Sequence, residues 1–194
     1  MDIDSLVRDP LSRRRFLGTA GASAAGGSAL LLAACGRESQ PLAEAGPDES
    51  DQADVEILNG ALDLEFMAVA AYKAGAAQLT GDLLQIGKLF LAQEQEHADG
   101  LTSTIKDAGG KPNRAKSAYD FPPLRSADDV LRYAVHLENT AIAFYIDALP
   151  KLTNGDVRAT AASIITTEAE HLAVLREALG HSPLPAAFVT GKVA

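Results

Sequence analysis

The chain has 194 residues, of which 22% are charged and 5% aromatic, and it carries a formal net charge of −9. This acidity argues against nucleic acid or an anionic lipid surface as the binding partner. Cys35 is the single cysteine, so the chain by itself forms neither a disulfide framework nor a thiolate metal site.

Residues 1–34 differ in composition from the rest of the chain. Ser12–Leu17 contains three consecutive arginines, and a weakly apolar stretch rich in Gly and Ala follows, too short for a stable membrane span. The arginine motif resembles a twin-arginine export signal. Leu32–Gly36 resembles the lipobox of bacterial lipoproteins, which implies a lipid on Cys35 and attachment to the extracytoplasmic or periplasmic face of a membrane. The alternative is an ordinary secretory signal with an incidental cysteine.

The rest of the chain divides into a tether, one domain and a tail. Residues 35–52 are polar and acidic and contain Pro and Gly, which is typical of a flexible linker. Residues 53–181 are long enough to enclose a single core, whereas residues 182–194 show no informative pattern. We therefore expect one folded domain on an acidic tether.

Four segments of this domain repeat apolar residues at spacings of three and four, and none alternates as a strand would. The segments are residues 53–78, 82–108, 127–149 and 156–179. Ser126 is a candidate N-cap, and Gly109 and Gly180 are typical helix stop signals. The sequence thus predicts an all-α domain of four helices.

Each predicted helix carries a glutamate on its apolar face. Two of these are Glu65 and Glu138, and the other two open the E-x-x-H motifs Glu94–His97 and Glu168–His171. A spacing of three places carboxylate and imidazole on one helix face. Unpaired buried carboxylates are costly, and no Lys or Arg lies on these faces. Two divalent cations would balance the four charges, and this donor set suits Fe, Mn or Zn better than Mg or Ca.

The four segments are two copies of one design. Residues 61–72 align with residues 134–145, and the two E-x-x-H motifs repeat 74 positions apart. Few residues join the helices within a copy, whereas residues 109–125 join the two copies. The pattern predicts two helical hairpins with one long crossover, and a two-metal site on the axis that relates them.

In this order and pairing, the motifs resemble the ferritin-like superfamily, specifically the exported bacterial ferritin-like domain proteins with a twin-arginine signal. The resemblance implies a ferritin-like four-helix bundle that binds two iron ions, with manganese as the alternative. The implied ligands are Glu65, Glu94, His97, Glu138, Glu168 and His171. Which glutamates bridge the ions is not determined by the sequence.

The resemblance further implies an oxidoreductase of ferroxidase, peroxidase or oxidase type, acting on dioxygen or peroxide with electrons from a separate, unknown donor. Two other interpretations stay open: a manganese catalase-like enzyme with the same ligands, and a non-catalytic metal-binding or scaffold lipoprotein. A homodimer is compatible with the sequence. A closed iron-storage shell is disfavoured, because a lipid tether on each chain conflicts with a soluble cage.

Two tyrosines are further candidates for a catalytic role. Tyr72 and Tyr145 each lie seven residues after a glutamate, two turns along the same helix face. They are expected to bond a ligand or to relay protons or electrons, with a plain core position as the alternative. Glu96 and Glu170 lie on the opposite side of their helices and are expected to be surface charges.

Overall fold

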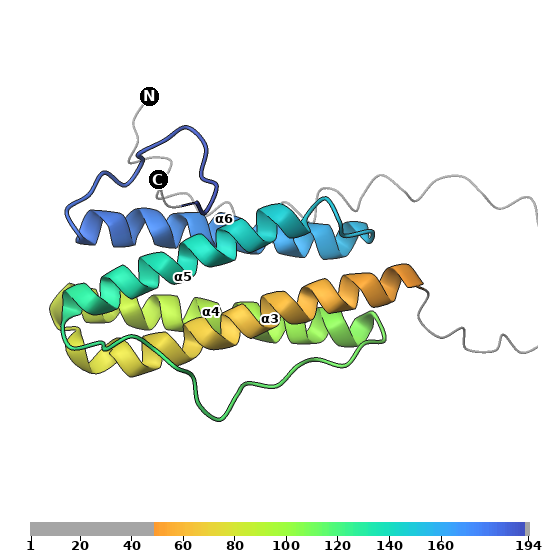
Figure 1. Cartoon of the computed structure of the whole chain (residues 1–194), viewed down its shortest axis with the longest axis horizontal. Helices are drawn as coiled ribbons and strands as arrows, with labels where there is room; N and C mark the ends of the chain where they lie inside the picture. Colours follow the sequence, from red (N-terminus) through yellow and green to blue (C-terminus); the bar gives the residue numbers. More distant parts are fainter. Residues whose placement is uncertain (1–48, 193–194) are drawn as a thin grey trace, which may run out of the picture. The chain divides into compact units, whose positions relative to one another are not determined.

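The computed structural model describes residues 49–192, which form four long α-helices and one short 3-10 helix. The elements are α3 (Glu49–Gly75), η1 (Ala76–Gln78), α4 (Gly81–Asp107), α5 (Ala127–Ala148) and α6 (Gly155–Ala178), as Figure 1 shows. These residues contain no strand, so the predicted all-α fold class is confirmed.

The twin-arginine motif, Cys35 and most of the predicted tether lie outside the described residues. Residues 49–52, predicted as the end of the tether, belong to α3 instead. They are polar and add nothing to the apolar pattern from which the helix start was predicted. At its other end α3 stops at Gly75, and the predicted continuation to residue 78 is the 3-10 turn η1. Within residues 49–192, no helix combines the length and apolar character that a membrane span needs.

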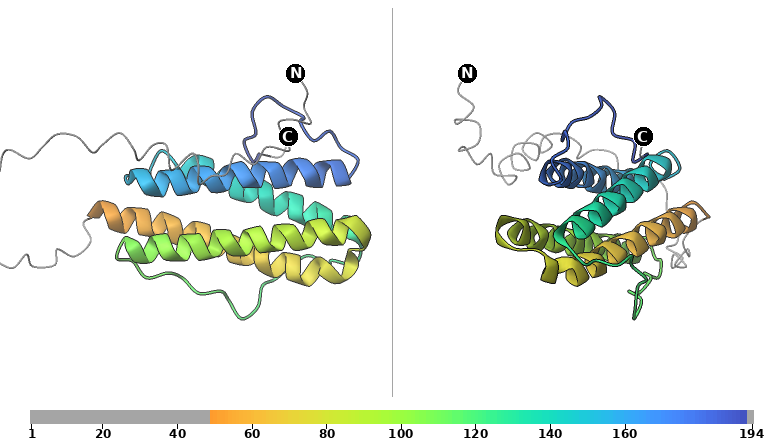
Figure 2. Two further views of the ribbon diagram at one scale, coloured as in Figure 1. Left: turned by 180° about the vertical axis from the view of Figure 1, so that it is seen from behind. Right: turned by 60° about the vertical axis from the view of Figure 1, so that its left-hand side comes forward.

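The helices pair as two antiparallel hairpins. α3 packs on α4 and α5 packs on α6, while α3 and α5 join the two hairpins (Figures 1 and 2). Residues 108–126 run along the bundle from the end of α4 to the start of α5, so these two helices point the same way (Figure 1). This is the predicted topology of two hairpins and one long crossover.

Local signals define the helix ends. The Ser126 hydroxyl accepts a hydrogen bond from the Asp129 backbone N–H, and the Asn154 side chain caps α6 in the same way. Gly109 and Gly180 adopt φ angles of 74° and 73°, the left-handed conformation that ends a helix and favours glycine. The predicted stops after α4 and α6 are therefore confirmed.

The crossover is hydrogen-bonded to the first helix. Asn59 donates to the carbonyl oxygen of Lys111 at 3.1 Å and accepts from the backbone N–H of Asn113 at 2.6 Å. The Asn113 side chain also donates to Asp63 at 3.0 Å. These bonds hold the long connection against α3.

Asp54 forms a second tie, between α3 and the turn that joins α5 to α6. Its carboxylate is 1% exposed and accepts hydrogen bonds from the backbone N–H groups of Thr153 and Asn154 and from the Thr153 hydroxyl. A buried carboxylate is tolerated when donors surround it in this way. The bonds connect the start of the first hairpin to the turn of the second.

Two of the three apolar clusters in the bundle interior lie on either side of the glutamates. The first cluster includes Leu62, Ala98, Leu101, Ala141 and Ile164. The second includes Tyr72, Phe90, Leu131, Ala134 and Leu175. Along each helix the predicted ligand glutamate lies between members of the two clusters, so apolar packing closes the site on both sides.

Candidate dinuclear metal centre

Six side chains meet in the middle of the bundle, and they are the six that the sequence singled out. The four glutamates are at most 1% exposed, the His171 residue is 2% exposed, and the His97 side chain is 12% exposed. Every helix contributes, because each places its glutamate on the buried face. Their role as metal ligands stays a prediction.

The six residues form two groups, each able to hold one metal ion. One group is Glu65, Glu94, His97 and Glu168, and the other is Glu94, Glu138, Glu168 and His171. In each group the ligand atoms lie within 4.8 Å of one another. The glutamates of both E-x-x-H motifs belong to both groups, so the structure shows which carboxylates are placed to be shared.

Both imidazole rings turn Nδ1 toward the carboxylates. His97 Nδ1 lies 3.0 Å from Glu168 Oε1, and His171 Nδ1 lies 3.0 Å from Glu94 Oε1. Each histidine is thus nearest to the glutamate of the other E-x-x-H motif. The side chains of the two hairpins therefore form one joint cluster at the centre and not two separate half-sites.

Several buried atoms of the centre lack a hydrogen bond. They are Glu94 Oε1, both carboxylate oxygens of Glu168, and Nδ1 of His97 and His171. Some of these nitrogen and oxygen atoms lie 3.0 Å from one another, yet none is aligned for a hydrogen bond. Buried polar atoms normally have a partner. Because these oxygen and nitrogen atoms suit Fe or Mn, the residues fit a pair of such ions.

The four carboxyl groups divide into two kinds. Burial raises the pKa of Glu65 to about 8 and raises that of Glu138 well above its ordinary value. Burial alone would also raise the pKa of Glu168, but contacts with both histidines outweigh it and lower this pKa to about 2. The same contacts lower the pKa of Glu94. Without metal, these shifts favour the ionised form of the two shared glutamates and the protonated form of the other two.

The two imidazoles carry the compensating charge in the metal-free centre. Burial alone would lower their pKa values, but the surrounding glutamates outweigh it. The pKa of His97 rises to about 12 and that of His171 to about 11. Two imidazolium ions and two carboxylates sum to zero, and so do two divalent cations with four carboxylates and two neutral imidazoles. With these protonation states the metal-free centre is electrically neutral and holds four protons that two divalent cations would replace.

The two candidate tyrosines hydrogen-bond across the hairpins. The Tyr72 hydroxyl donates to Glu138 Oε1, and the Tyr145 hydroxyl donates to Glu65 Oε1, each at 2.6 Å. Burial and the charge of the bonded glutamate raise both tyrosine pKa values well above the ordinary value. Both tyrosines are core residues and each bonds a predicted ligand, while their catalytic role stays a prediction.

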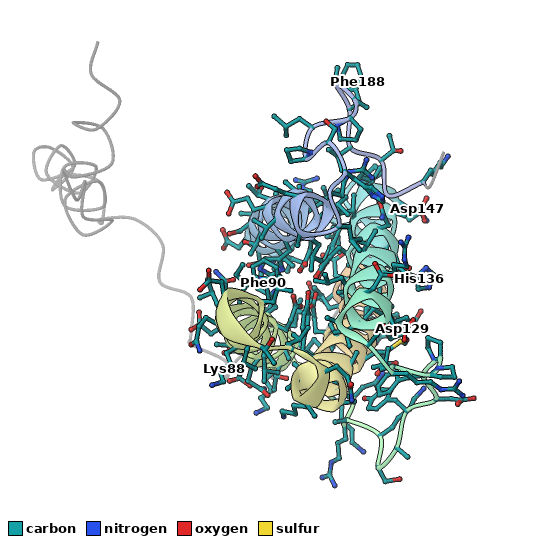
Figure 3. The ribbon with its side chains drawn as sticks, turned by 90° about the vertical axis from the view of Figure 1, so that its left-hand side faces the viewer. Lys88, Phe90, Asp129, His136, Asp147 and Phe188 are labelled. Atoms are coloured by element: carbon teal, nitrogen blue, oxygen red, sulfur yellow. The ribbon has the colours of Figure 1, made fainter. Side chains whose placement is uncertain are left out.

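The sequence analysis missed one polar neighbour of the centre, Gln93. Its Oε1 atom lies 2.9 Å from Nε2 of His171. Gln93 lies four residues before His97 and therefore on the same side of α4. This spacing in the sequence could have predicted its place beside the centre. Glu96 and Glu170 are exposed, as expected, and His136 lies on the outer side of α5 (Figure 3).

Comparison with known proteins agrees with this fold. The Ferritin-like domain family model matches residues 53–181, and the chain belongs to this family. No curated protein matches the chain.

Solved structures of bacterial proteins share the architecture. A dodecameric thioferritin, the bacterioferritin-related protein of Bacteroides fragilis, is 26% identical, with a TM-score of 0.60, and the match covers 67% of this chain and 86% of that one. A ferritin-like diiron-carboxylate protein of Bacillus anthracis is 24% identical, with a TM-score of 0.61 and coverage of 68% and 99%. The bacterioferritin of Desulfovibrio desulfuricans is 20% identical, with a TM-score of 0.63 and coverage of 75% and 95%.

Proposed function

We propose that this protein binds two iron ions through its six buried ligands, with manganese as the alternative metal. The observation that carries the proposal is that Glu94 and Glu168 belong to both ligand groups, while buried ligand atoms there lack hydrogen bonds. Four carboxylates and two E-x-x-H imidazoles are the donor set of di-iron and di-manganese members of ferritin-like proteins. Membership in the Ferritin-like domain family supports the same function.

We further propose that the protein is an oxidoreductase that acts on dioxygen or peroxide. Two iron ions held by these residues would supply a change of oxidation state shared between them. Apolar clusters on both sides of the glutamates keep bulk water away from the centre. In this proposal the electrons come from a separate donor.

The chain's own residues hold protons at defined atoms of this centre. Tyr72 and Tyr145 keep their hydroxyl protons, because their pKa values are raised. Their hydroxyl groups donate hydrogen bonds to Glu138 and Glu65. These bonds orient the two glutamates that belong to one ligand group each.

Metal analysis of the purified chain tests the proposal. We expect about two iron or manganese ions per chain by elemental analysis, followed by turnover of peroxide or dioxygen with a chemical reductant. Manganese content with peroxide disproportionation would favour the catalase-like alternative. Metal content without turnover would favour the non-catalytic one, and a chain that binds neither metal after stripping and refilling would refute the proposal.

We also propose that the domain works at the cell envelope, exported by the twin-arginine route and anchored by a lipid on Cys35. The support is the pair of N-terminal motifs, since the acyl chains would contribute about 0.8 kcal/mol per buried methylene to membrane binding. Cys35→Ala is expected to move the protein into soluble fractions, and lysine at Arg13 and Arg14 to block export. Unchanged membrane association of Cys35→Ala would rule out the lipid anchor.

A further inference from the structure

His171 is held from two directions that do not involve the carboxylates. The Phe90 ring stacks on its imidazole, with ring centroids 3.9 Å apart and an interplanar angle of 28°. Figure 3 shows Phe90 on the side of α4 that faces α6. Gln93 Oε1 lies 2.9 Å from Nε2 of the same ring. Both residues come from α4, so the first hairpin fixes the histidine of the second.

The contact with Gln93 selects one tautomer of His171. A neutral imidazole that offers its Nδ1 lone pair to a metal carries its proton on Nε2. That N–H needs an acceptor, and the Gln93 carboxamide oxygen is placed to be one. Such outer hydrogen bonds orient a ligating histidine and raise its basicity, and their loss typically lowers metal affinity about 10- to 100-fold.

The equivalent contact is missing in the other half of the repeat. The repeat pairs Gln93 with Thr167 and Phe90 with Ile164. The Thr167 hydroxyl donates to the Ser163 carbonyl of its own helix. Within residues 49–192, the polar contacts of His97 are all made through Nδ1, and its side chain is 12% exposed against 2% for His171.

We infer that Gln93 is a positioning residue for His171, and that it makes the two metal positions unequal. The position formed with Glu138 and His171 binds its ion more tightly, and the position formed with Glu65 and His97 binds its ion more weakly. The inference rests on the proposed two-metal function and adds to it a rank order of the sites and the residue that sets it.

The test is a titration of the metal-free full-length chain with Mn(II), in which electron paramagnetic resonance measures the free ion. Wild type is expected to bind two ions with distinct affinities. Gln93→Leu removes the acceptor at similar volume and is expected to weaken the tighter ion about 10- to 100-fold. Gln93→Glu keeps an acceptor oxygen and is expected to restore tight binding. Thr167→Val, the matched change in the other hairpin, is expected to leave both affinities unchanged.

A double-mutant cycle assigns the effect to one site. Gln93→Leu is expected to have no further effect in a His171→Ala background and its full effect in a His97→Ala background, because Gln93 contacts His171 and residues in contact couple. Far-ultraviolet circular dichroism of the metal-free variants verifies the fold, and Gln93→Ala replaces Gln93→Leu if that variant does not fold.

Each failure has a distinct meaning. If wild type binds two ions and Gln93→Leu leaves both affinities unchanged, the inference is wrong while the two-metal function stands. If Gln93→Glu binds as weakly as Gln93→Leu, Gln93 does not act as an acceptor and the inference is again wrong. If metal-free wild type binds no Mn(II) and no Fe(II), both the function and the inference are rejected.

Discussion

The α3–α4 and α5–α6 hairpins present the same predicted metal ligands in different surroundings. Each supplies one glutamate, one E-x-x-H motif and one tyrosine that bonds the glutamate of the other hairpin. Around them the hairpins differ: His171 is enclosed by Phe90 and Gln93, whereas His97 is more exposed. The two hairpins also contact different segments outside the bundle. The crossover hydrogen-bonds to α3, whereas Gly191 of the tail lies against the backbone of α5.

The comparison shows that a repeated sequence pattern does not give the two histidines of the centre equal surroundings. The ligands depend on helix periodicity, which the two hairpins share. The contacts around these side chains depend on single residues such as Gln93 and its counterpart Thr167, which differ between the hairpins. The following predictions test where the two halves act alike and where they diverge.

The largest expected effect comes from the shared glutamates. Adding Mn(II) or Fe(II) to the metal-free chain is expected to stabilise it by about 2.7 kcal/mol per ion at a hundredfold excess over the dissociation constant. This stabilisation is measured as a rise in melting temperature. Glu94→Ala or Glu168→Ala is expected to abolish the rise, because each residue belongs to both ligand groups. Glu65→Ala is expected to remove only part of it.

Differential scanning calorimetry with and without metal measures these melting temperatures. Glu96→Ala, which changes an exposed glutamate of the same helix, is the control and is expected to keep the full rise. A Glu94→Ala chain that is stabilised by metal as strongly as wild type would contradict the shared role.

The second prediction concerns the protons that metal displaces. In the metal-free centre at pH 7, both histidines and the carboxyls of Glu65 and Glu138 are protonated, because all four pKa values are raised. Loading two ions is therefore expected to release up to four protons, and apparent affinity is expected to increase with pH. Calorimetric titration in buffers of different ionisation enthalpy counts the protons. Binding without proton release would contradict the charge assignment.

The third prediction is the pH dependence of the metal-free fold. The folded pKa of Glu65, about 8, exceeds its ordinary value of 4.5, so stability is lost as pH rises between these values. Protonated His97 adds stability that is lost between pH 6.5 and about 12. Urea unfolding of the metal-free chain is thus expected to show falling stability from pH 5 to pH 8, with a smaller fall in Glu65→Gln. Stability that increases over this interval would contradict it.

The fourth prediction is an equal effect in the two hairpins. Tyr72→Phe and Tyr145→Phe each remove one buried hydrogen bond of 2.6 Å, and each is expected to cost about 1–2 kcal/mol. Chemical denaturation of the metal-free variants measures the loss. Tyr133→Phe is the control, because Tyr133 bonds only weakly, to the Met67 sulfur at 3.9 Å. A large difference between the two core tyrosines would show that the hairpins differ in their tyrosine contacts as well.

The smallest expected effect concerns the N-terminal caps of α4 and α6, which follow the turn of each hairpin. Asn154 caps α6 with bonds to two backbone N–H groups, whereas the Thr80 side chain makes no such bond to α4. Asn154→Ala is therefore expected to cost about 1 kcal/mol and Thr80→Ala clearly less. Thermal unfolding measures both, and equal losses would contradict the difference in capping.

The sequence predicted most of the helical architecture because the signals involved are local. Ser126 and Asn154 begin their helices and Gly109 and Gly180 end theirs, through bonds to residues a few positions away. The start of α3 at Glu49 was missed, since its polar first turn carries no apolar period. The buried carboxylate of Asp54 was missed as well, although it lies four residues before the core residue Leu58.

The repeated E-x-x-H motif and the apolar periodicity also brought out the six residues of the centre, because periodicity determines which face of a helix each side chain occupies. It does not determine which side chains meet across the bundle. That Glu94 and Glu168 join both ligand groups depends on how the two hairpins pack together. The same packing directs Gln93 to His171 while Thr167 bonds within its own helix. Helix faces follow from the order of residues along the chain, whereas contacts between helices follow from crossing and tilt, which the whole core sets together.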